Sequence, residues 1–356
     1  MTNFNNSKDC GSKYNILIAS YLEPEYVNRI RQVDDRFNVI YEPELLQTPR
    51  YAADHKGEPT NRTPDNEVRW QQLLSQADIL FDFDETHLED LPDLAPNVRW
   101  VQATSSGIGQ KLKLMDYSTR MANTIFTTAG GVHAQPLAEF CLMVMLMFNK
   151  GLYRMISEQK RKHWERYAGT DFQNRTLAII GIGRVGREIA RVGKAMNMRV
   201  IGVDREEANI DPASVNVDQL YTQDQLHEVL PQAEYLVIIV PHTPETEKMI
   251  GAAELALLPK GAIFINISRG AVIDESALVK ALQSGHLGGA GLDVFAEEPL
   301  PENSPFWEME NVLISPHSAS TSDRENSRIT DIFCENLRRF LANKTLINIL
   351  DTERLF

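Results

Sequence analysis

Three polar side chains of the chain occur where apolar runs typical of buried β-strands come to an end. Arg269 follows the run at 264–267, His317 follows the run at 312–314, and Asp293 ends a third run between them. Ligands of open α/β sheets bind at the carboxyl ends of the strands. A guanidinium grips a carboxylate through two parallel hydrogen bonds, and a histidine exchanges protons near neutral pH. The pattern therefore predicts a ligand site at one edge of the sheet, in which Arg269 is suited to bind the carboxylate of a small acid.

A second candidate site begins where the run at 177–180 leads into Gly181-Ile182-Gly183-Arg184-Val185-Gly186, with a helical pattern behind it. This strand–turn–helix context is the one in which a GxGxxG pattern binds a dinucleotide. Gly181 permits the tight turn, Gly183 lets the backbone approach the pyrophosphate, and Gly186 allows close helix–strand packing. Free N–H groups at the helix start, joined by Arg184, would then face the phosphates. A glycine-rich turn without a ligand is the alternative.

The predicted strand at 199–203 runs into Asp204. An acidic side chain at this place binds the hydroxyls of the adenosine ribose, and its charge repels a 2′-phosphate. We therefore expect NAD as the cofactor rather than NADP. The adjacent Arg205 keeps NADP open as the alternative, because a guanidinium binds phosphate.

These residues depend on apolar runs that alternate with amphipathic stretches along most of the chain. The alternation predicts parallel sheets covered by helices, and 356 residues suggest two domains. The segment at 47–66 reads as an irregular excursion, and the polar and aromatic segment at 151–174 as an arm or loop. We expect strands at 14–19, 37–41, 77–81, 98–103, 177–180, 199–203, 235–240, 262–267, 289–292 and 311–314. We expect helices at 24–33, 65–75, 133–150, 184–196 and 323–341.

Composition excludes several classes of protein. A formal net charge of −13 disfavours nucleic acid as a general partner. No apolar run reaches the roughly 18 residues that a membrane span needs, and residues 1–12 read as a mobile tail rather than a signal peptide. Cys10, Cys141 and Cys334 are far apart, which argues against disulfides and a thiolate metal site. We therefore expect a cytoplasmic protein with no metal, membrane or nucleic-acid partner.

Taken together, the motifs resemble those of the D-isomer-specific 2-hydroxyacid dehydrogenases, over about residues 14–346. The most specific matches, in the family's order and spacing, are the glycine motif at 181–186, Ser268-Arg269-Gly270, Asp293-Val294-Phe295 with Glu298-Pro299, and Pro316-His317. The resemblance implies hydride transfer between NAD(H) and C2 of a small D-2-hydroxy acid or 2-keto acid. It implies Arg269 as the residue that binds the substrate, His317 as the acid/base and Glu298 as the partner of the histidine.

The chemistry of such a reaction fits these residue types. Reduction of a 2-keto acid needs a hydride at the carbonyl carbon and a proton at its oxygen, and His317 can donate that proton. A Glu298 carboxylate at the other ring nitrogen would fix the tautomer and favour the imidazolium. Arg269 would hold the substrate carboxylate and polarise its carbonyl. Nicotinamide supplies the hydride chemistry.

Two further segments resemble family loops. The segment at 104–109 is similar to the loop whose backbone N–H groups bind the substrate carboxylate, and the segment at 240–244 to one that lines the cofactor cleft. The expected substrate-binding residues are Ser105, Ser106, Gly107, Ile108, Arg269 and His317. The expected cofactor-binding residues are Gly181, Gly183, Arg184, Val185, Gly186, Asp204, Arg205, Val240, Pro241, His242, Thr243, Ile267, Ser268, Asp293 and Ser318.

The resemblance also implies an architecture. A Rossmann NAD-binding domain at 133–320 is inserted into a discontinuous, flavodoxin-like substrate domain at 13–132 and 321–356. Both domains are doubly wound α/β folds with parallel sheets, and the active site lies in the cleft between them. The family resemblance further implies a homodimer built largely on the cofactor domains, with the arm at 151–174 involved.

Other functions stay open at this point. Some relatives act as NAD-sensing corepressors and retain the same Arg, Glu and His, and phosphite dehydrogenases use a similar set. Formate dehydrogenases usually carry Gln where this chain has Glu298. The residues do not fix which 2-hydroxy acid is used, the physiological direction, or the role of the excursion at 47–66.

Overall fold

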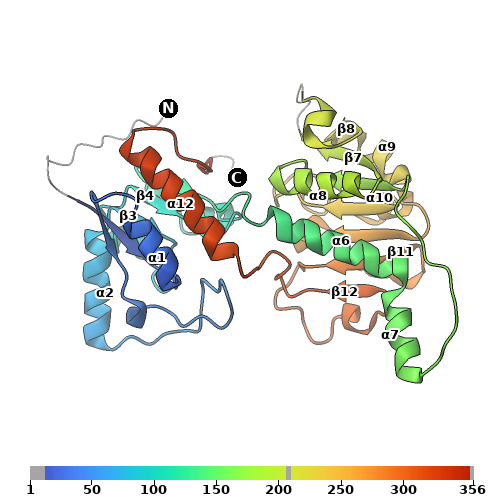
Figure 1. Ribbon diagram of the computed structural model, residues 1–356, viewed down its shortest axis with the longest axis horizontal. Coiled ribbons are helices and arrows are strands. Elements are labelled where there is room, and N and C mark those ends of the chain that lie inside the picture. The colour runs from blue at the N-terminus through green and yellow to red at the C-terminus, as the bar shows by residue number, and fades with distance from the viewer. Residues whose placement is uncertain (1–12, 206–209, 353–356) are drawn as a thin grey trace. The chain divides into compact units, whose positions relative to one another are not determined.

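The chain folds into two compact units in a computed structural model that describes residues 13–205 and 210–352. Unit 1 consists of the described residues of Met1–Val132 and Thr321–Phe356, and unit 2 of those in His133–Ser320. The second unit interrupts the first, so the chain passes between them twice (Figure 1). The expected tail at 1–12 lies outside the described residues. In the part that is described, no helix is both long and apolar enough to cross a bilayer.

Unit 1 is built on a parallel sheet of five strands in the order β2-β1-β3-β4-β5. Its strands are β1 (Tyr14–Ile18), β2 (Phe37–Ile40), β3 (Ile79–Phe81), β4 (Trp100–Gln102) and β5 (Ile125–Thr127). Its helices are α1 (Pro24–Arg31), α2 (Pro64–Gln76), α3 (Leu91–Leu94), α4 (Gly109–Leu114), α5 (Tyr117–Arg120) and α12 (Glu325–Leu341). This order is the flavodoxin-like one.

Successive side chains of β1 enter two separate cores of unit 1. Ile16 and Ile18 pack in the core that contains α1 and α12, whereas Leu17 packs in the core that contains α2. Figure 1 shows α12, the last helix of the chain, beside α1 near its beginning. Alternation along the strand thus covers both faces of the sheet with helices, as expected for parallel strands.

Unit 2 is built on a parallel sheet of seven strands in the order β12-β11-β10-β9-β6-β7-β8. Its strands are β6 (Thr176–Ile180), β7 (Arg199–Asp204), β8 (Gln219–Thr222), β9 (Tyr235–Ile238), β10 (Ala262–Asn266), β11 (Leu287–Leu292) and β12 (Val312–Ile314). Its helices are α6 (Ala134–Lys150), α7 (Leu152–Arg161), α8 (Arg184–Ala195), α9 (Leu226–Val229), α10 (Ala252–Leu257) and α11 (Glu275–Gln283). The order reverses at β6, which is the Rossmann arrangement with its switch point between β6 and β9.

The structure confirms all of the expected strands and helices to within a few residues, and it adds elements that the sequence pattern did not predict. The expected arm or loop at 151–174 is wrong in its first half, because Leu152–Arg161 forms α7. Gly151 ends α6 with a φ of 64°, and a new helix starts immediately. None of the side chains of α7 is buried, so no core periodicity marked it as a helix. The excursion between η1 (Pro43–Leu45) and α2 is irregular, as predicted.

Candidate active site

The turn between β6 and α8 is built around three glycines with different constraints. Gly181 has a φ of +106°, and a Cβ there would lie 2.5 Å from the Ile239 carbonyl oxygen. A Cβ on Gly186 would lie 1.9 Å from the Gly181 carbonyl oxygen. A Cβ on Gly183 would meet nothing within 4 Å. Two of the glycines are therefore needed by the fold, whereas Gly183 leaves open space beside the backbone.

That open space lies at the beginning of α8. Gly183 is its N-cap and supplies no side-chain cap, and the first N–H groups of a helix such as this 12-residue one have no acceptor within the helix. Arg184 is exposed at the first position of the helix, and Val185 is half-buried at the second. Together with the switch point at β6, these residues fit the pyrophosphate of a dinucleotide.

The next strand along, β7, places Asp204 at the same edge of the sheet. Val203 and Asp204 end the strand beside Tyr221 and Thr222 of β8. One carboxylate oxygen of Asp204 accepts the backbone N–H of Arg205 at 2.7 Å, and Arg205 is exposed. The acidic side chain therefore stands one strand away from the glycine turn, where an adenosine ribose would lie.

The residues Arg269, Asp293 and His317 follow three neighbouring strands. Asn266 of β10 pairs with Leu292 of β11, which pairs with Ile314 of β12. The carboxyl ends of these strands are thus level, and the segments that follow them meet at one edge of the sheet. Ile180 and Ile238 end β6 and β9 at the same level, so the glycine turn belongs to the same edge.

His317 and Glu298 are in direct contact. Nδ1 of His317 lies 2.7 Å from Oε2 of Glu298. The other oxygen, Oε1 of Glu298, accepts the backbone N–H of Phe295 at 3.0 Å. Both side chains are partly exposed, at 44% for His317 and 36% for Glu298. This arrangement fixes one ring nitrogen on a carboxylate and leaves Nε2 for a proton transfer.

Asp293 holds the turn that carries His317. Its buried carboxylate Oδ1 accepts the Ser315 hydroxyl at 2.5 Å and the N–H groups of Ser318 and Ala319 at 2.8 and 2.9 Å. Its carbonyl oxygen accepts the N–H of His317 at 2.9 Å. We expected Asp293 to bind the cofactor. The structure shows that it positions His317.

Arg269 is positioned by a residue that the sequence reasoning did not single out. The side-chain oxygen of buried Asn266 accepts the Ser268 N–H at 3.1 Å and the Ser268 hydroxyl at 2.7 Å, and its amide donates to the Arg269 carbonyl at 3.3 Å. The sequence did contain a signal for this role of Asn266, namely an asparagine at the end of an otherwise apolar strand. A Cβ on Gly270 would lie 1.9 Å from the Phe295 carbonyl carbon, so this turn packs against the Phe295 backbone.

Burial lowers the pKa of Arg269 from its ordinary value, while the nearby carboxylates of Glu298 and Asp293 act in the opposite direction. Nη1 of Arg269 donates to the Ser268 carbonyl at 2.6 Å. A guanidinium has five N–H groups, and those that do not take part in this bond can bind a carboxylate. Desolvation strengthens such a charge-assisted contact.

The other expected cofactor residues lie around the same edge. Val240, His242 and Thr243 are partly buried after β9, and Pro241 is exposed. Their turn is held by Thr246, whose hydroxyl donates to the Pro241 carbonyl at 2.7 Å. Ile267 and Ser268 are buried after β10, and Ser318 is exposed after His317.

The expected substrate loop belongs to unit 1 and follows β4. Ser105, Ser106 and Gly107 are exposed, whereas Ile108 is 3% exposed and packs in the α2-side core. Any contact of Ile108 with a substrate therefore comes from its backbone. Next to this loop, Thr104 donates to buried Asp82 at 2.8 Å.

A histidine of the irregular excursion is anchored at this edge of unit 1. Nδ1 of His55 lies 3.1 Å from the hydroxyl of Ser20, which follows β1, and 4.0 Å from the Asp82 carboxylate, which follows β3. The His55 side chain is 11% exposed. No motif marked it, because the histidine and its two partners come from three separate segments.

Comparison with known proteins shows the family to which the chain belongs. Residues 142–319 match the family model for the NAD-binding domain of the D-isomer-specific 2-hydroxyacid dehydrogenases. The chain is 32% identical to a glyoxylate reductase of Aeropyrum pernix over 297 residues, which cover 80% of this chain and 87% of the relative. The chain belongs to the D-isomer-specific 2-hydroxyacid dehydrogenase family. It is thus an NAD(P)-dependent oxidoreductase of the hydroxyacid class.

Further relatives show the breadth of the family. A D-3-phosphoglycerate dehydrogenase of Methanocaldococcus jannaschii is 31% identical over 217 residues, which cover 60% of this chain and 41% of that protein. The solved structure of a family member from Aeromonas salmonicida superposes with a TM-score of 0.78 at 26% identity, covering 96% of this chain and 100% of that one. A structure from Xanthobacter autotrophicus with NADPH bound has a TM-score of 0.75 at 24% identity, over 97% and 100% of the two chains.

Proposed function

We propose that this enzyme transfers a hydride between NAD(H) and C2 of a small D-2-hydroxy acid or 2-keto acid. The contact between His317 Nδ1 and Glu298 at 2.7 Å supports this most strongly, because it prepares the histidine as an acid/base. Glyoxylate is the first substrate to test, since the Aeropyrum relative of similar length is a glyoxylate reductase.

The residues have separate roles in this proposal. Arg269 binds the carboxylate of the substrate and polarises its carbonyl. His317 gives a proton to the developing alkoxide from Nε2, and Glu298 stabilises the imidazolium before that transfer. The exposed backbone of Ser105, Ser106 and Gly107 also contributes to substrate binding. When it is bound, NADH supplies the hydride.

The cofactor would be held by the residues at the carboxyl edge of unit 2. The N–H groups at the start of α8 bind the pyrophosphate beside Gly183, and Asp204 binds the ribose hydroxyls. We propose NAD over NADP, because the Asp204 carboxylate would repel a 2′-phosphate, and we place Asp293 and Thr243 among the residues near the nicotinamide end.

The test is the consumption of NADH with glyoxylate, hydroxypyruvate, pyruvate and bulkier 2-keto acids, with NADPH in parallel. We expect turnover of at least one acid, and a fall in kcat/KM of about 10²–10³-fold in Arg269→Ala, as for loss of a group that stabilises the transition state. Arg269→Lys keeps the charge but loses the paired hydrogen bonds, so its kcat/KM should lie between the values for the wild type and Arg269→Ala.

Binding of NADH to the same variants separates catalysis from folding. His317→Ala should bind NADH as the wild type does and lose about 10²–10⁴-fold in kcat, the usual contribution of a positioned acid. Tight NADH binding with no turnover of any 2-keto acid would refute the proposal and favour a sensor or a different acceptor.

A further inference from the structure

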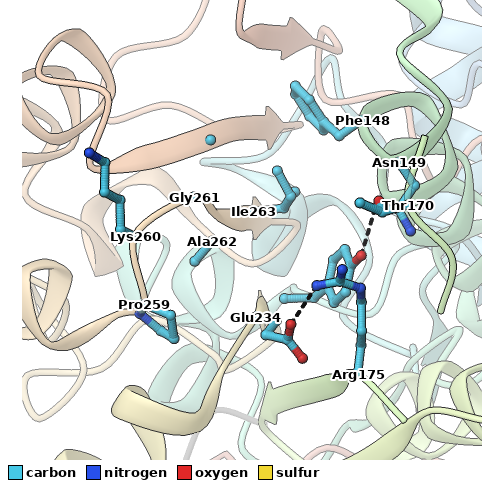
Figure 2. A pocket seen from close by; sticks show the side chains of 12 residues that line it. Phe148, Asn149, Thr170, Arg175, Glu234, Pro259, Lys260, Gly261, Ala262 and Ile263 are labelled. Atoms are coloured by element: carbon cyan, nitrogen blue, oxygen red, sulfur yellow. Dashed lines mark hydrogen bonds and ion pairs between the residues drawn. The ribbon is translucent and has the colours of Figure 1, made fainter. Parts of the chain in front are cut away.

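A cavity lies at the opposite edge of the unit 2 sheet from the candidate active site. Its volume is about 330 Å³, and it opens where strands β9, β10 and β11 begin. The wall is formed by the end of α6, by Thr170 and Arg175 in the segment before β6, and by residues just before or at the start of these three strands (Figure 2). Nothing in the proposed reaction uses this edge.

The lining combines apolar surfaces with a net positive charge. Phe148, Tyr235 and Ile263 contribute apolar surface, and Arg175 and Lys260 contribute cations. Nη1 of Arg175 pairs with Glu234 at 2.5 Å and Nε donates to the Asp171 carbonyl at 2.9 Å, so the guanidinium keeps the donors of Nη2 for a further acceptor. In an acidic chain with a net charge of −13, such a spot favours a small anion over a cation.

The cavity wall also contains an amide donor that lacks a partner. The side chain of Asn149 accepts the Tyr235 hydroxyl at 2.6 Å, whereas its nitrogen has no hydrogen-bond partner in the described part of the chain. A buried donor without an acceptor is unfavourable, because it has lost its hydrogen bonds to water and gained none in return. Figure 2 shows Asn149 and Arg175 on one side of the cavity and Lys260 on the other.

We propose that this cavity binds a small organic carboxylate. The carboxylate would accept from Arg175 and, after a small adjustment of the wall, from the Asn149 amide. The body of the acid would lie against Phe148, Tyr235 and Ile263. Lys260 raises the local positive potential from the other side. The ligand would therefore join the end of α6 to the amino edge of the sheet.

Benzoate is a suitable probe, because it has an apolar body and one carboxylate but no 2-keto group. We expect calorimetric titration of the protein to give a Kd on the order of 1 mM, as for a small weak ligand. Benzamide, the neutral isostere, should bind at least about tenfold more weakly, because the charge-assisted hydrogen bonds are lost.

Variants locate the site. Arg175→Gln should weaken the binding of benzoate about tenfold. Thr170→Trp places a large side chain at an exposed position of the lining and should abolish binding while the fold is kept. Lys260→Ala should weaken the binding of benzoate several-fold. The control is Lys280→Ala, because Lys280 is exposed on α11 and does not line the cavity, and this variant should bind benzoate as the wild type does.

Three outcomes would overturn the proposal. The first is that benzoate does not bind. The second is that Arg175→Gln and Thr170→Trp both bind it as the wild type does. The third is that binding is lost in Arg269→Ala, which would place the ligand in the proposed active site instead. None of these outcomes depends on whether the chain turns over 2-keto acids.

Discussion

His317 has a backbone φ of +52°, a left-handed conformation that is uncommon for residues other than glycine. Such a conformation persists only where its surroundings impose it, and here four hydrogen bonds to Asp293 hold the segment from Ser315 to Ala319. The imidazole is then placed against Glu298 by the same turn. A single buried carboxylate thus fixes the backbone, and a second, partly exposed one fixes the ring.

The choice of cofactor belongs to the residue scale as well. Asp204→Ser should lower kcat/KM with NADH and raise it with NADPH, so that the ratio between the two changes by about tenfold or more, because a charge is removed from the ribose site. Steady-state rates with both cofactors measure this ratio. An unchanged preference would mean that Asp204 does not face the ribose.

The remainder of the site shows what a sequence pattern leaves out. Arg269, Asp293 and His317 could be predicted because each follows an apolar run, and the level ends of β10, β11 and β12 confirm that they share an edge. The hydrogen bonds of Asn266 could not be predicted, because they depend on how the turn after β10 folds back.

At the scale of elements, the glycine turn after β6 allows a matched pair of variants. Gly186→Ala should destabilise unit 2 by about 2 kcal/mol or more, because its Cβ would overlap the Gly181 carbonyl. Gly183→Ala has open space and extended backbone, so its unfolding should match that of the wild type. Its NADH affinity should nevertheless fall about tenfold or more, because the methyl group occupies the approach of the pyrophosphate.

Urea denaturation and NADH titration of both variants make this comparison. Wild-type NADH affinity in Gly183→Ala would show that no phosphate approaches this backbone. Equal stability of Gly186→Ala and the wild type would contradict the close packing of α8 on β6.

Helix α2 is tied to the segment before α3 through a histidine whose charge depends on pH. Nε2 of His87 lies 2.8 Å from Glu67 of α2, and Nδ1 lies 3.1 Å from Asp90. Burial acts to lower the pKa of His87, but the carboxylates of Asp84, Asp90 and Glu67 outweigh it, and the pKa is raised. The charged form is therefore the one that stabilises the fold.

We expect His87→Gln to be less stable than the wild type below about pH 6.5, which is the ordinary pKa of a histidine. Below this pH the charged His87 makes its full contribution to the stability of the fold. The difference should shrink as the pH rises through the raised pKa of the folded state. Thermal melts of both proteins across this range measure it. A difference that grows with pH would contradict the assignment.

The sequence could predict the central strands and the long helices that bury one regular face. It missed the strands β5 and β8, with three and four residues, and α7, none of whose side chains is buried. It also missed α11, although that helix buries Ala277, Leu278 and Leu282, and the short helices α3, α4, α5, α9 and α10. Strand β8 lies at the edge of the sheet and shows no fully buried residue, so it lacks the apolar run of a central strand. Short or solvent-facing elements depend on tertiary neighbours rather than on local periodicity.

At the scale of the whole molecule, α7 and the segment after it expose apolar side chains close together in sequence. Leu152, Tyr153, Met155 and Ile156 are each about 40% exposed, and Trp164 is 94% exposed. Exposed apolar surface of this kind marks a protein–protein contact. We propose that this arm contributes to the interface of a homodimer.

We expect Ile156→Glu to weaken dimerisation by about 30-fold or more, since a charge would replace a central apolar contact. Light scattering during gel filtration gives the mass at several protein concentrations. Leu114→Glu, at an equally apolar and more exposed position in unit 1, should leave the mass unchanged. A wild-type protein that is monomeric at all concentrations would rule out this interface.

The insertion of unit 2 into unit 1 has a consequence for the order of events during synthesis. Unit 2 is one continuous segment, whereas the core of unit 1 around β1 and α1 contains Ile329, Phe333, Leu337 and Phe340 of α12. Strand β1 must therefore wait until α12 has been translated, about 16–65 s later at roughly 5–20 residues per second, because β1 ends at Ile18 and α12 ends at Leu341. The later-made unit can thus be native first, and a chain cut short before α12 would leave an apolar sheet face bare for chaperones to recognise.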